Sequence, residues 1–395
     1  MDQRAEFIGL AQQAGANIRE LSRRYAISPT TAYKWLNRYS AAGNDGDAGL
    51  AEHSRRPTTS PSRTKASMEK QIVAARAVHP KWGARKLKRW LANQGVNDLP
   101  AASTVHAILL RSGLINPLDS TAHQPWHRFE HPAPNDLWQM DFKGHFAVGS
   151  QTAIAGTAKG SECLQARCHP LTVLDDHSRF VVCLSAQGNE QFTPTQQRLI
   201  HTFRRYGLPK RMTMDNGSPW GEPGRYTRFE LWLMRLGIRV THSRPYHPQT
   251  QGKDERFHRT LKAEVLQDQW FADLHHAQQQ FDQWLPIYNQ ERPHEALQMN
   301  TPASRYTSSP RAYPEHLPEL EYNAHDTVRK VQGKGELHYQ GKTYLLGQAF
   351  SGQPVALRRT SCDGTMQVYF SIHLVATMTL TTQSIVIEKE RRIEI

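Results

Sequence analysis

Residues 171–186 read LTVLDDHSRFVVCLSA, two apolar runs separated by a polar triplet. Short apolar runs bounded by turn residues predict two strands joined by a tight turn. Working outward, residues 136–148 (DLWQMDFKGHFAV) alternate like a further strand, and residues 193–207 (TPTQQRLIHTFRRYG) predict a helix. The next elements are predicted as strand, helix and strand, over residues 210–217, 228–237 and 238–245. This order of elements predicts a mixed α/β core.

The segments before and after this core have different sequence patterns. Residues 6–40 predict short helices, with Ser28 as the N-cap and Pro29 in the first turn of a helix that follows a short turn. This is the helix-turn-helix pattern. A second such unit is predicted further on, with Ser103 as an N-cap, and short strands near the end of the sequence predict a small β-barrel.

The chain is therefore expected to be multidomain, with all-α units first, an α/β core and a small β-barrel last. The expected ranges are a first helix-turn-helix DNA-binding domain at 1–42, a linker at 43–67, a second helix-turn-helix DNA-binding domain at 68–118, the core at 125–306 and the barrel at 320–395.

The charge of the chain favours a polyanionic partner. The 395 residues carry a formal net charge of +13. Residues 1–128 hold 19 Lys or Arg against 9 Asp or Glu, whereas residues 129–310 hold 20 against 18. The basic excess lies with the predicted DNA-binding units, which points to double-stranded DNA. Long apolar runs and a secretory signal are missing and only 4 cysteines occur, so we expect a cytoplasmic, nucleoid-associated protein.

Residues that would contact DNA lie at the polar, basic starts of the predicted helices. The candidates in the two helical units are Thr30, Thr31, Lys34, Arg38, Arg85, Lys86, Ser103, Thr104 and His106. His242, Tyr246 and His247 precede the last helix of the core and either line a DNA groove, which we favour, or pack a loop.

Acidic residues at three places in the core are candidates for a metal-binding active site. Asp141 stands inside an apolar strand, where a carboxylate is costly without a partner. Asp215 stands at a strand end, the place where α/β sites form. A third acid follows in HPQTQGKDERFHRTLK (residues 247–262). Carboxylates that converge from such places suit Mg²⁺ or Mn²⁺. Asp175 and Asp176 are an alternative pair, although a turn role suits them better.

The positions of Asp254 and Glu255 around the predicted helix indicate which of the two is the metal ligand. At about 100° per residue, Glu255 shares a face with Arg259 and Lys262, whereas Asp254 projects nearer to the apolar side. Glu255 is therefore the predicted ligand, and Arg259 and Lys262 are predicted to bind phosphates. The role of Asp254 stays open.

Five stretches together resemble the catalytic core of insertion-sequence transposases of the DDE type, which is similar to retroviral integrase and has an RNase H-like fold. They are DLWQMDFKG, LTVLDDHSRF, MTMDNGSPW, HPQTQGKDERFHRTLK and YNQERPHEALQMNTPASRY. The resemblance covers about residues 125–306 and implies a catalytic, metal-binding triad of Asp141, Asp215 and Glu255. The spacing from Asp215 to Glu255 and the segment 150–168 are both longer than the family pattern, without loss of a ligand.

The resemblance also implies a reaction. Two Mg²⁺ or Mn²⁺ ions would support hydrolysis that exposes 3′-OH ends at transposon termini, followed by strand transfer of those ends to target DNA. Joining two ends implies a dimer or tetramer. Two other functions are weighed against this one. A domesticated, non-catalytic DNA-binding regulator is disfavoured by the three intact acids, and a plain nuclease is disfavoured by the two DNA-binding units.

Overall fold

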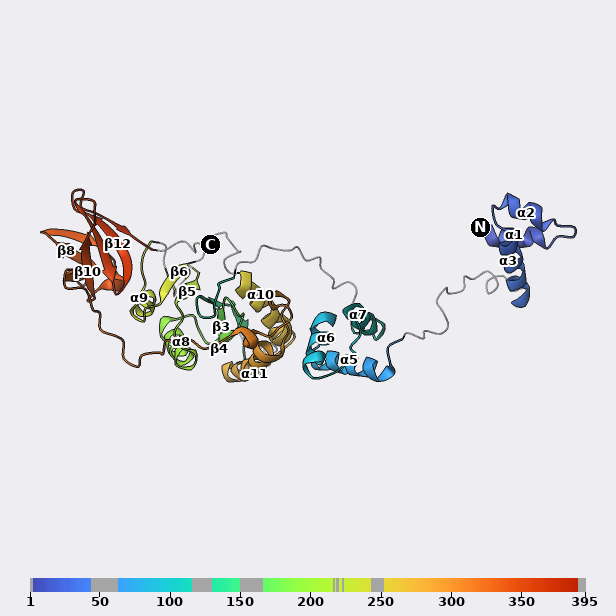
Figure 1. Ribbon diagram of the computed structural model, residues 1–395, viewed down its shortest axis with the longest axis horizontal. Helices are drawn as coiled ribbons and strands as arrows, with labels where there is room; N and C mark the ends of the chain where they lie inside the picture. Colours follow the sequence, from blue (N-terminus) through green and yellow to red (C-terminus); the bar gives the residue numbers. More distant parts are fainter. Residues whose placement is uncertain are drawn as a thin grey trace, which may run out of the picture. The chain divides into compact units, whose positions relative to one another are not determined.

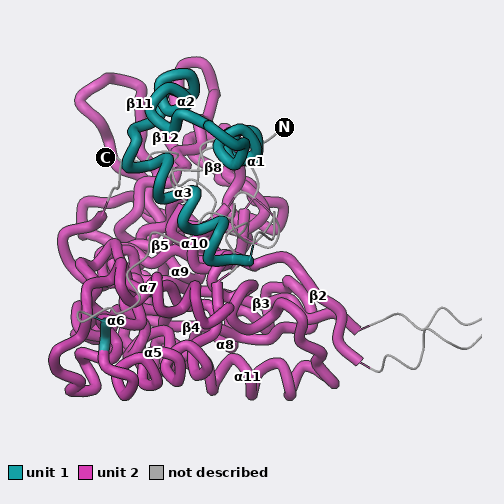
Figure 2. The backbone as a smooth tube through the Cα atoms, turned by 90° about the vertical axis from the view of Figure 1, so that its right-hand side faces the viewer, with its two compact units in different colours: residues 1–64 teal, residues 65–395 magenta. Residues whose placement is uncertain are grey.

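The computed structural model describes residues 3–43, 63–115, 130–149, 166–215, 217, 220–221, 224–242 and 252–389. The chain divides into two compact units, residues 1–64 and 65–395 (Figure 2). The predicted linker and the segment 150–168 fall mostly outside the described residues, as do Tyr246 and His247.

Unit 1 holds three helices, α1 (Gln3–Ala11), α2 (Ile18–Arg24) and α3 (Pro29–Ala41). The predicted N-cap is confirmed, because the Ser28 hydroxyl accepts a hydrogen bond from the Thr31 backbone N–H at 3.1 Å and Pro29 begins α3. Phe7, Ile8 and Ala32 form the small buried core. Four residues separate α2 from α3, in agreement with the predicted helix-turn-helix arrangement.

Unit 2 begins with three further helices, α5 (Ala66–Val78), α6 (Ala84–Asn93) and α7 (Ala102–Arg111). Here the predicted cap is wrong: α7 starts one residue before Ser103, its N-cap position is Ala101, and no side chain caps it. Trp82, Leu87, Val105 and Ile108 are among the apolar side chains that hold the three helices together.

The core sheet is ordered β2-β3-β1-β5-β6, with β4 paired to the other side of the β3 segment. Its strands are β1 (Trp138–Phe142), β2 (Phe146–Ala147), β3 (Arg167–Asp175), β4 (Val181–Gln187), β5 (Arg211–Met214) and β6 (Arg239–His242). The strands β1, β3 and β4 pair antiparallel, whereas β5 runs parallel to β1 and β6 runs parallel to β5. The predicted hairpin and its turn are confirmed.

Helices cover both faces of the sheet, as labelled in Figure 1. One face packs against α8 (Phe192–Tyr206) and α9 (Arg228–Arg235), and the other packs against α10 (Gly252–Leu261) and α11 (Leu274–Pro286). Both α10 and α11 continue into a short π-helical turn, Lys262–Leu266 and Ile287–Glu291. The predicted α/β core is confirmed in its order of elements, and α8 ends as predicted at Gly207, where φ is 76°.

The Pro/Ser-rich segment after the core is packed rather than free. The Arg311 guanidinium donates to the carbonyl oxygens of Pro209, Leu236 and Gly237 at 2.6–3.0 Å, and its own carbonyl accepts from the Leu208 N–H at 2.7 Å. The segment therefore fastens the loops that precede β5 and β6.

The C-terminal region is built of strands, but the described strands form no closed barrel. One sheet has the order β13-β12-β11-β10-β7, and β8 and β9 form a separate hairpin. The strands are β7 (Thr327–Lys330), β8 (Glu336–Tyr339), β9 (Lys342–Leu345), β10 (Pro354–Arg359), β11 (Thr365–Phe370), β12 (His373–Thr379) and β13 (Ser384–Ile387). Leu231 and Met234 of α9 share the apolar core of this domain, so it docks on the α/β core.

Candidate active site

The strand register brings Asp141 and Asp215 side by side. Trp138 pairs with Met212 and Gln139 with Thr213 across the parallel strands β1 and β5. Two more residues along each strand set Asp141 level with Asp215, and neighbouring strands lie about 4.8 Å apart. The Asp215 carboxylate also accepts from the Gly217 N–H at 3.0 Å, and a Cβ on Gly217 would lie 3.0 Å from that carboxylate. A side chain at position 217 would therefore press on the Asp215 carboxylate.

The charge of this pair is unfavourable without a counter-ion. Burial, followed by the neighbouring charge of Asp215, raises the pKa of Asp141 from its ordinary 3.8 to about 7, and Glu190 and Glu255 act in the same direction. Carboxylates that repel one another in a partly buried site are the environment that a hard divalent cation relieves. The donor set thus fits Mg²⁺ or Mn²⁺. Among the described residues, however, no three His, Cys, Asp or Glu side chains stand close enough together to bind one ion.

The helix α10 separates its two acids as predicted. Glu255 is exposed in the first turn, and Arg259 and Lys262 are exposed further along. Asp254 is fully buried, and neither of its carboxylate oxygens has a hydrogen-bond partner within the described ranges. Burial, followed by the charges of Asp141 and Asp176, raises the pKa of Asp254 well above its usual range. Asp254 therefore lies in the protein interior, whereas Glu255 is on the surface of the helix.

The start of α10 is fastened to the hairpin turn after β3. Lys253 forms an ion pair with the Asp176 carboxylate and also donates to the Asp176 carbonyl oxygen at 3.2 Å. Asp175 accepts from the N–H and hydroxyl of Ser178 and from the Asn135 N–H. The predicted turn role of Asp175 and Asp176 is thus confirmed. Lys253 was missed by the sequence reasoning, since nothing local indicates its partner.

His258 is a second residue that the sequence reasoning missed. Its Nε2 lies 2.8 Å from the Thr172 hydroxyl, and its Nδ1 lies 3.9 Å from an Asp141 carboxylate oxygen. Burial, followed by the charge of Lys143, lowers the pKa of His258 to about 4, so the ring is neutral near pH 7. It stands four residues after Asp254, and this helical spacing is the signal that places it on the same inner face.

Two lysines near the candidate site, Lys143 and Lys262, act on each other electrostatically. Lys143 follows β1 directly, and burial together with the charge of Lys262 lowers its pKa. The two ammonium groups are thus close enough to repel each other. A pair of like charges beside a carboxylate site suits a phosphate that would lie against both. Lys143 is a further site residue that sequence reasoning missed.

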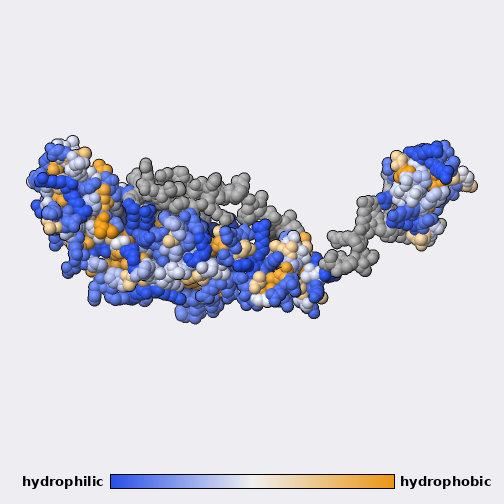
Figure 3. All heavy atoms as spheres, viewed as in Figure 1, coloured by the Kyte–Doolittle hydropathy of each residue, from blue (hydrophilic) through white to orange (hydrophobic). Residues whose placement is uncertain are grey.

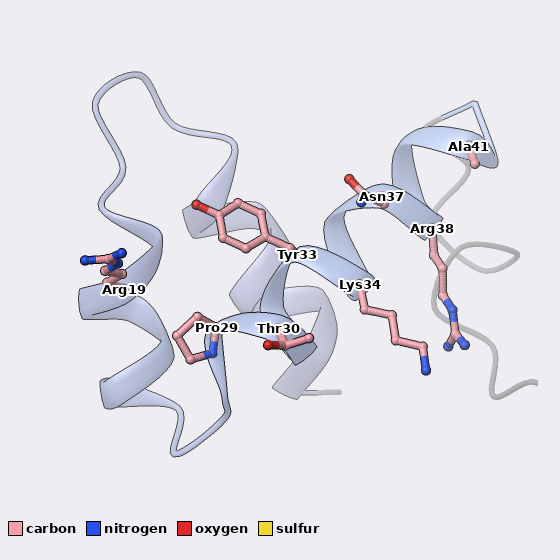
Figure 4. A pocket seen from close by; sticks show the side chains of 8 residues that line it. All are labelled: Arg19, Pro29, Thr30, Tyr33, Lys34, Asn37, Arg38 and Ala41. Atoms are coloured by element: carbon pink, nitrogen blue, oxygen red, sulfur yellow. The ribbon is translucent and has the colours of Figure 1, made fainter.

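The predicted DNA contacts of unit 1 border a surface groove along α3, lined by Thr30, Lys34 and Arg38 (Figure 4). Lys34 and Arg38 project from the same side of the helix. Thr31 is turned toward the helix cap, where its hydroxyl lies 2.9 Å from the Ser28 hydroxyl. Much of the unit's visible surface is hydrophilic (Figure 3).

The predicted DNA contacts of the second helical unit lie on two helices with different surroundings. Ser103 and His106 are exposed on α7, and Thr104 is half-buried. On α6, Arg85 lies 3.8 Å from the Glu295 carboxylate and Arg89 donates to the Asn300 side chain at 3.2 Å. Burial, followed by the charge of Arg292, lowers the pKa of Lys86 to about 8. The basic start of α6 is therefore turned toward the α/β core.

His242 does not line a groove, contrary to the interpretation we favoured from the sequence. It is buried at the end of β6, where its Nδ1 lies 2.8 Å from the Asp215 carbonyl oxygen. Cys168 is also buried, and burial raises the pKa of its thiol to about 12.

Comparison with known families defines the class of protein. Residues 131–248 and 236–302 match two integrase core domain families, and residues 326–386 match the IS481 family transposase C-terminal domain. Residues 3–58 match a helix-turn-helix domain, and residues 31–109 match a homeodomain-like domain. The core is thus similar to integrase core domains, and the C-terminal domain is similar to that of IS481 family transposases.

Individual relatives agree with this family. The chain is 25% identical over 180 residues to the insertion element IS407 uncharacterized 31.7 kDa protein of Burkholderia multivorans, covering 46% of this chain and 58% of the relative. It is 28% identical to the insertion element IS476 uncharacterized 39.2 kDa protein of Xanthomonas euvesicatoria, covering 43% and 44%. It is 30% identical to the transposase for insertion sequence element IS21 of Pseudomonas aeruginosa, covering 48% and 50%. The chain thus spans about half the length of the curated relatives it matches.

Two alignments with solved structures cover different shares of the chain. The chain aligns at 16% identity with a chain of the simian T-cell lymphotropic virus intasome complex, covering 76% of this chain and 96% of that chain. It aligns at 14% with the HTLV-2 integrase catalytic core domain in complex with magnesium, covering 44% and 97%. The TM-scores of the two alignments are 0.36 and 0.30. Within the described ranges, no helix is long and apolar enough to cross a membrane.

Proposed function

We propose that the chain is a DNA transposase that binds the terminal inverted repeats of its element, cleaves phosphodiester bonds to expose 3′-OH ends and joins those ends to target DNA. The observation that carries the proposal is the parallel register of β1 and β5, which sets Asp141 level with Asp215, in a site where burial first and the charge of Asp215 second raise the pKa of Asp141 to about 7. The integrase core and helix-turn-helix matches support it.

Each site residue has a proposed role. Asp141, Asp215 and Glu255 would hold two Mg²⁺ or Mn²⁺ ions. The bound ions would supply Lewis-acid activation of the attacking oxygen and charge stabilisation at the leaving oxygen. Lys143, Arg259 and Lys262 would orient the scissile phosphate. Neutral His258 and the Lys253–Asp176 pair would keep α10 against β1 and β3, so that Glu255 reaches the two aspartates.

Partners follow from the reaction. The groove along α3 would bind a transposon end, and target DNA would enter beside the carboxylates. Two ends must be held by one assembly if they are joined together, so we propose a dimer or tetramer. The alternative of a non-catalytic DNA-binding regulator would leave the carboxylates without a role, although their mutual repulsion is unfavourable for the fold.

The test uses labelled duplexes that carry the inverted repeats of the element, with Mg²⁺. Glu255→Gln should lower cleavage and joining by about 10³-fold, because several kcal/mol of transition-state stabilisation would be lost with a metal ligand. DNA binding, measured by fluorescence anisotropy, should stay unchanged because Glu255 is not among the proposed DNA contacts.

The matched control is the neighbouring acid. Asp254→Asn should keep measurable joining activity, since Asp254 is buried and does not face the phosphate. Loss of activity in Asp254→Asn with full activity in Glu255→Gln would contradict the assignment of the triad. A wild-type chain that binds the repeats without cleaving or joining them would favour the regulator.

A further inference from the structure

The hydrogen bonds behind Asp215 lead away from the carboxylates into the protein interior. The His242 ring, buried at the end of β6, bonds the Asp215 carbonyl oxygen through Nδ1 at 2.8 Å and the Glu230 carboxylate through Nε2 at 2.7 Å. A carbonyl oxygen can only accept, so Nδ1 carries the hydrogen and donates it to Asp215. The ring is thus held from both sides, and it fixes the backbone of the residue whose side chain is a proposed metal ligand.

Glu230 is the centre of this network. Its side chain is fully buried in the first turn of α9, and one oxygen accepts from the Thr227 N–H at 2.6 Å as part of a capping box. The other oxygen lies 2.7 Å from His242 and 3.0 Å from the Lys389 ammonium group. A buried carboxylate is stable only with such partners. Glu230 therefore joins the N-terminus of α9, the end of β6 and a residue from the far end of the chain.

Lys389 belongs to the C-terminal domain, two residues after β13. Its ammonium group also donates to the Arg225 carbonyl oxygen at 2.7 Å, and only 6% of its side chain is exposed. The preceding residue is held as well, because the Tyr226 hydroxyl donates to the Glu388 carbonyl oxygen. The end of the C-terminal domain is thus bound to the segment that leads into α9.

Gly221 lies close to this network. A Cβ on Gly221 would lie 2.7 Å from His242 Cε1 and 3.0 Å from the Lys389 ammonium nitrogen. The Gly221 N–H in turn donates to the Gly217 carbonyl oxygen at 3.2 Å, in the turn that presents Asp215. Gly221 therefore packs directly on His242 and Lys389.

We propose that Lys389 is a positioning residue that acts on Asp215 through Glu230 and His242, so that docking of the C-terminal domain on α9 sets the geometry of a catalytic metal ligand. The proposal rests on the proposed function in one respect, the role of Asp215 as a ligand. Its consequence is that the metal affinity of the site depends on a side chain in another domain. Partners that orient a ligand typically change metal affinity or activity by about 10–100-fold when they are removed.

The experiment measures Mn²⁺ binding to the full-length chain without DNA, by the electron paramagnetic resonance signal of unbound Mn²⁺. Lys389→Met should raise the Kd for Mn²⁺ by about 10-fold, because the neutral side chain leaves Glu230 and His242 free to shift. Lys389→Arg should restore most of the affinity. With labelled transposon ends, Lys389→Met should lower kcat and leave KM for DNA unchanged.

The matched control is Lys342→Met. Lys342 also donates to a backbone carbonyl, that of Leu380, but the bond stays within the C-terminal domain. This variant should bind Mn²⁺ like the wild type, whereas Asp215→Asn should lose that binding. Wild-type Mn²⁺ affinity in Lys389→Met, or retained binding in Asp215→Asn, would overturn the positioning role.

Failure of the two proposals can be told apart. A wild-type chain that binds Mn²⁺ through Asp215 but neither cleaves nor joins DNA contradicts the transposase function alone, and the Lys389 variants still decide the positioning role. A wild-type chain that binds no Mn²⁺ overturns both.

Discussion

At the scale of single residues, Asp254 is a carboxyl group in an unfavourable environment. Its carboxyl group is fully buried, and neither oxygen has a hydrogen-bond partner in the described part of the chain. Because its pKa is raised in the folded state, its contribution to stability is present at low pH and is lost as the pH rises above the ordinary value of 3.8. The metal-free wild type should therefore lose stability toward neutral pH.

Asp254→Asn should remove this loss. In EDTA we expect no difference in the free energy of unfolding near pH 4 and a stabilisation near pH 8, because the amide of the variant does not ionise and the buried carboxyl group of the wild type does so only at a cost. Urea unfolding at several pH values measures it. Glu255→Gln is the matched control, because its side chain is exposed one residue away and should show no such pH-dependent gain. An equal gain in both variants would contradict the burial argument.

The difference between these two neighbours was predictable because helix phase is a local property. A rotation of about 100° per residue separates Asp254 from Glu255 whatever the rest of the chain does. The partners of the same helix were not predictable. The ion pair of Lys253 with Asp176 and the contact of His258 with Thr172 join residues 77 and 86 positions apart. Only the assembled sheet brings them together.

At the scale of elements, the two N-caps predicted from the sequence had opposite outcomes. Ser28 caps α3, whereas Ser103 lies inside α7 and caps nothing. Both sites read alike, as a hydroxyl residue at the start of a helical stretch. At the first site Pro29 directly follows the serine and fixes the helix start. The proline nearest to Ser103 is Pro100, which lies ahead of the N-cap residue Ala101, and α7 begins at Ala102.

This contrast gives a matched pair of variants. Ser28→Ala should destabilise α3 by about 1 kcal/mol, because the Thr31 N–H loses its acceptor. Hydrogen exchange of the full-length chain should show protection of the α2–α3 segment reduced by about fivefold. Ser103→Ala should leave the protection of α7 unchanged. Equal effects at the two serines would mean that the hydroxyls do not differ in capping.

At the scale of the whole molecule, the basic residues near helix starts lie in two different environments, one exposed and one packed against the core. The sequence alone does not distinguish the two. Lys34 is exposed along the α3 groove, whereas Lys86 is half-buried near Arg292 of the α/β core. Both were predicted as DNA contacts because each stands near the basic start of a helix. The positions of Lys86 and of Lys389 depend on the packing of domains on one another. Periodicity and charge counting along one sequence do not contain that information.

The salt dependence of DNA binding distinguishes the two lysines. A cation that neutralises a phosphate releases counterions, so its removal lowers the slope of log K against log salt by about one. Lys34→Ala and Arg38→Ala should each weaken binding to duplex DNA and lower the slope by this amount. Lys86→Ala should leave the slope unchanged, since the Lys86 side chain is partly buried and its pKa is lowered first by that burial and then by the charge of Arg292. Fluorescence anisotropy between about 50 and 200 mM salt covers the useful range. An equal change of slope in Lys86→Ala would mean that α6 leaves the core and turns its basic residues to DNA.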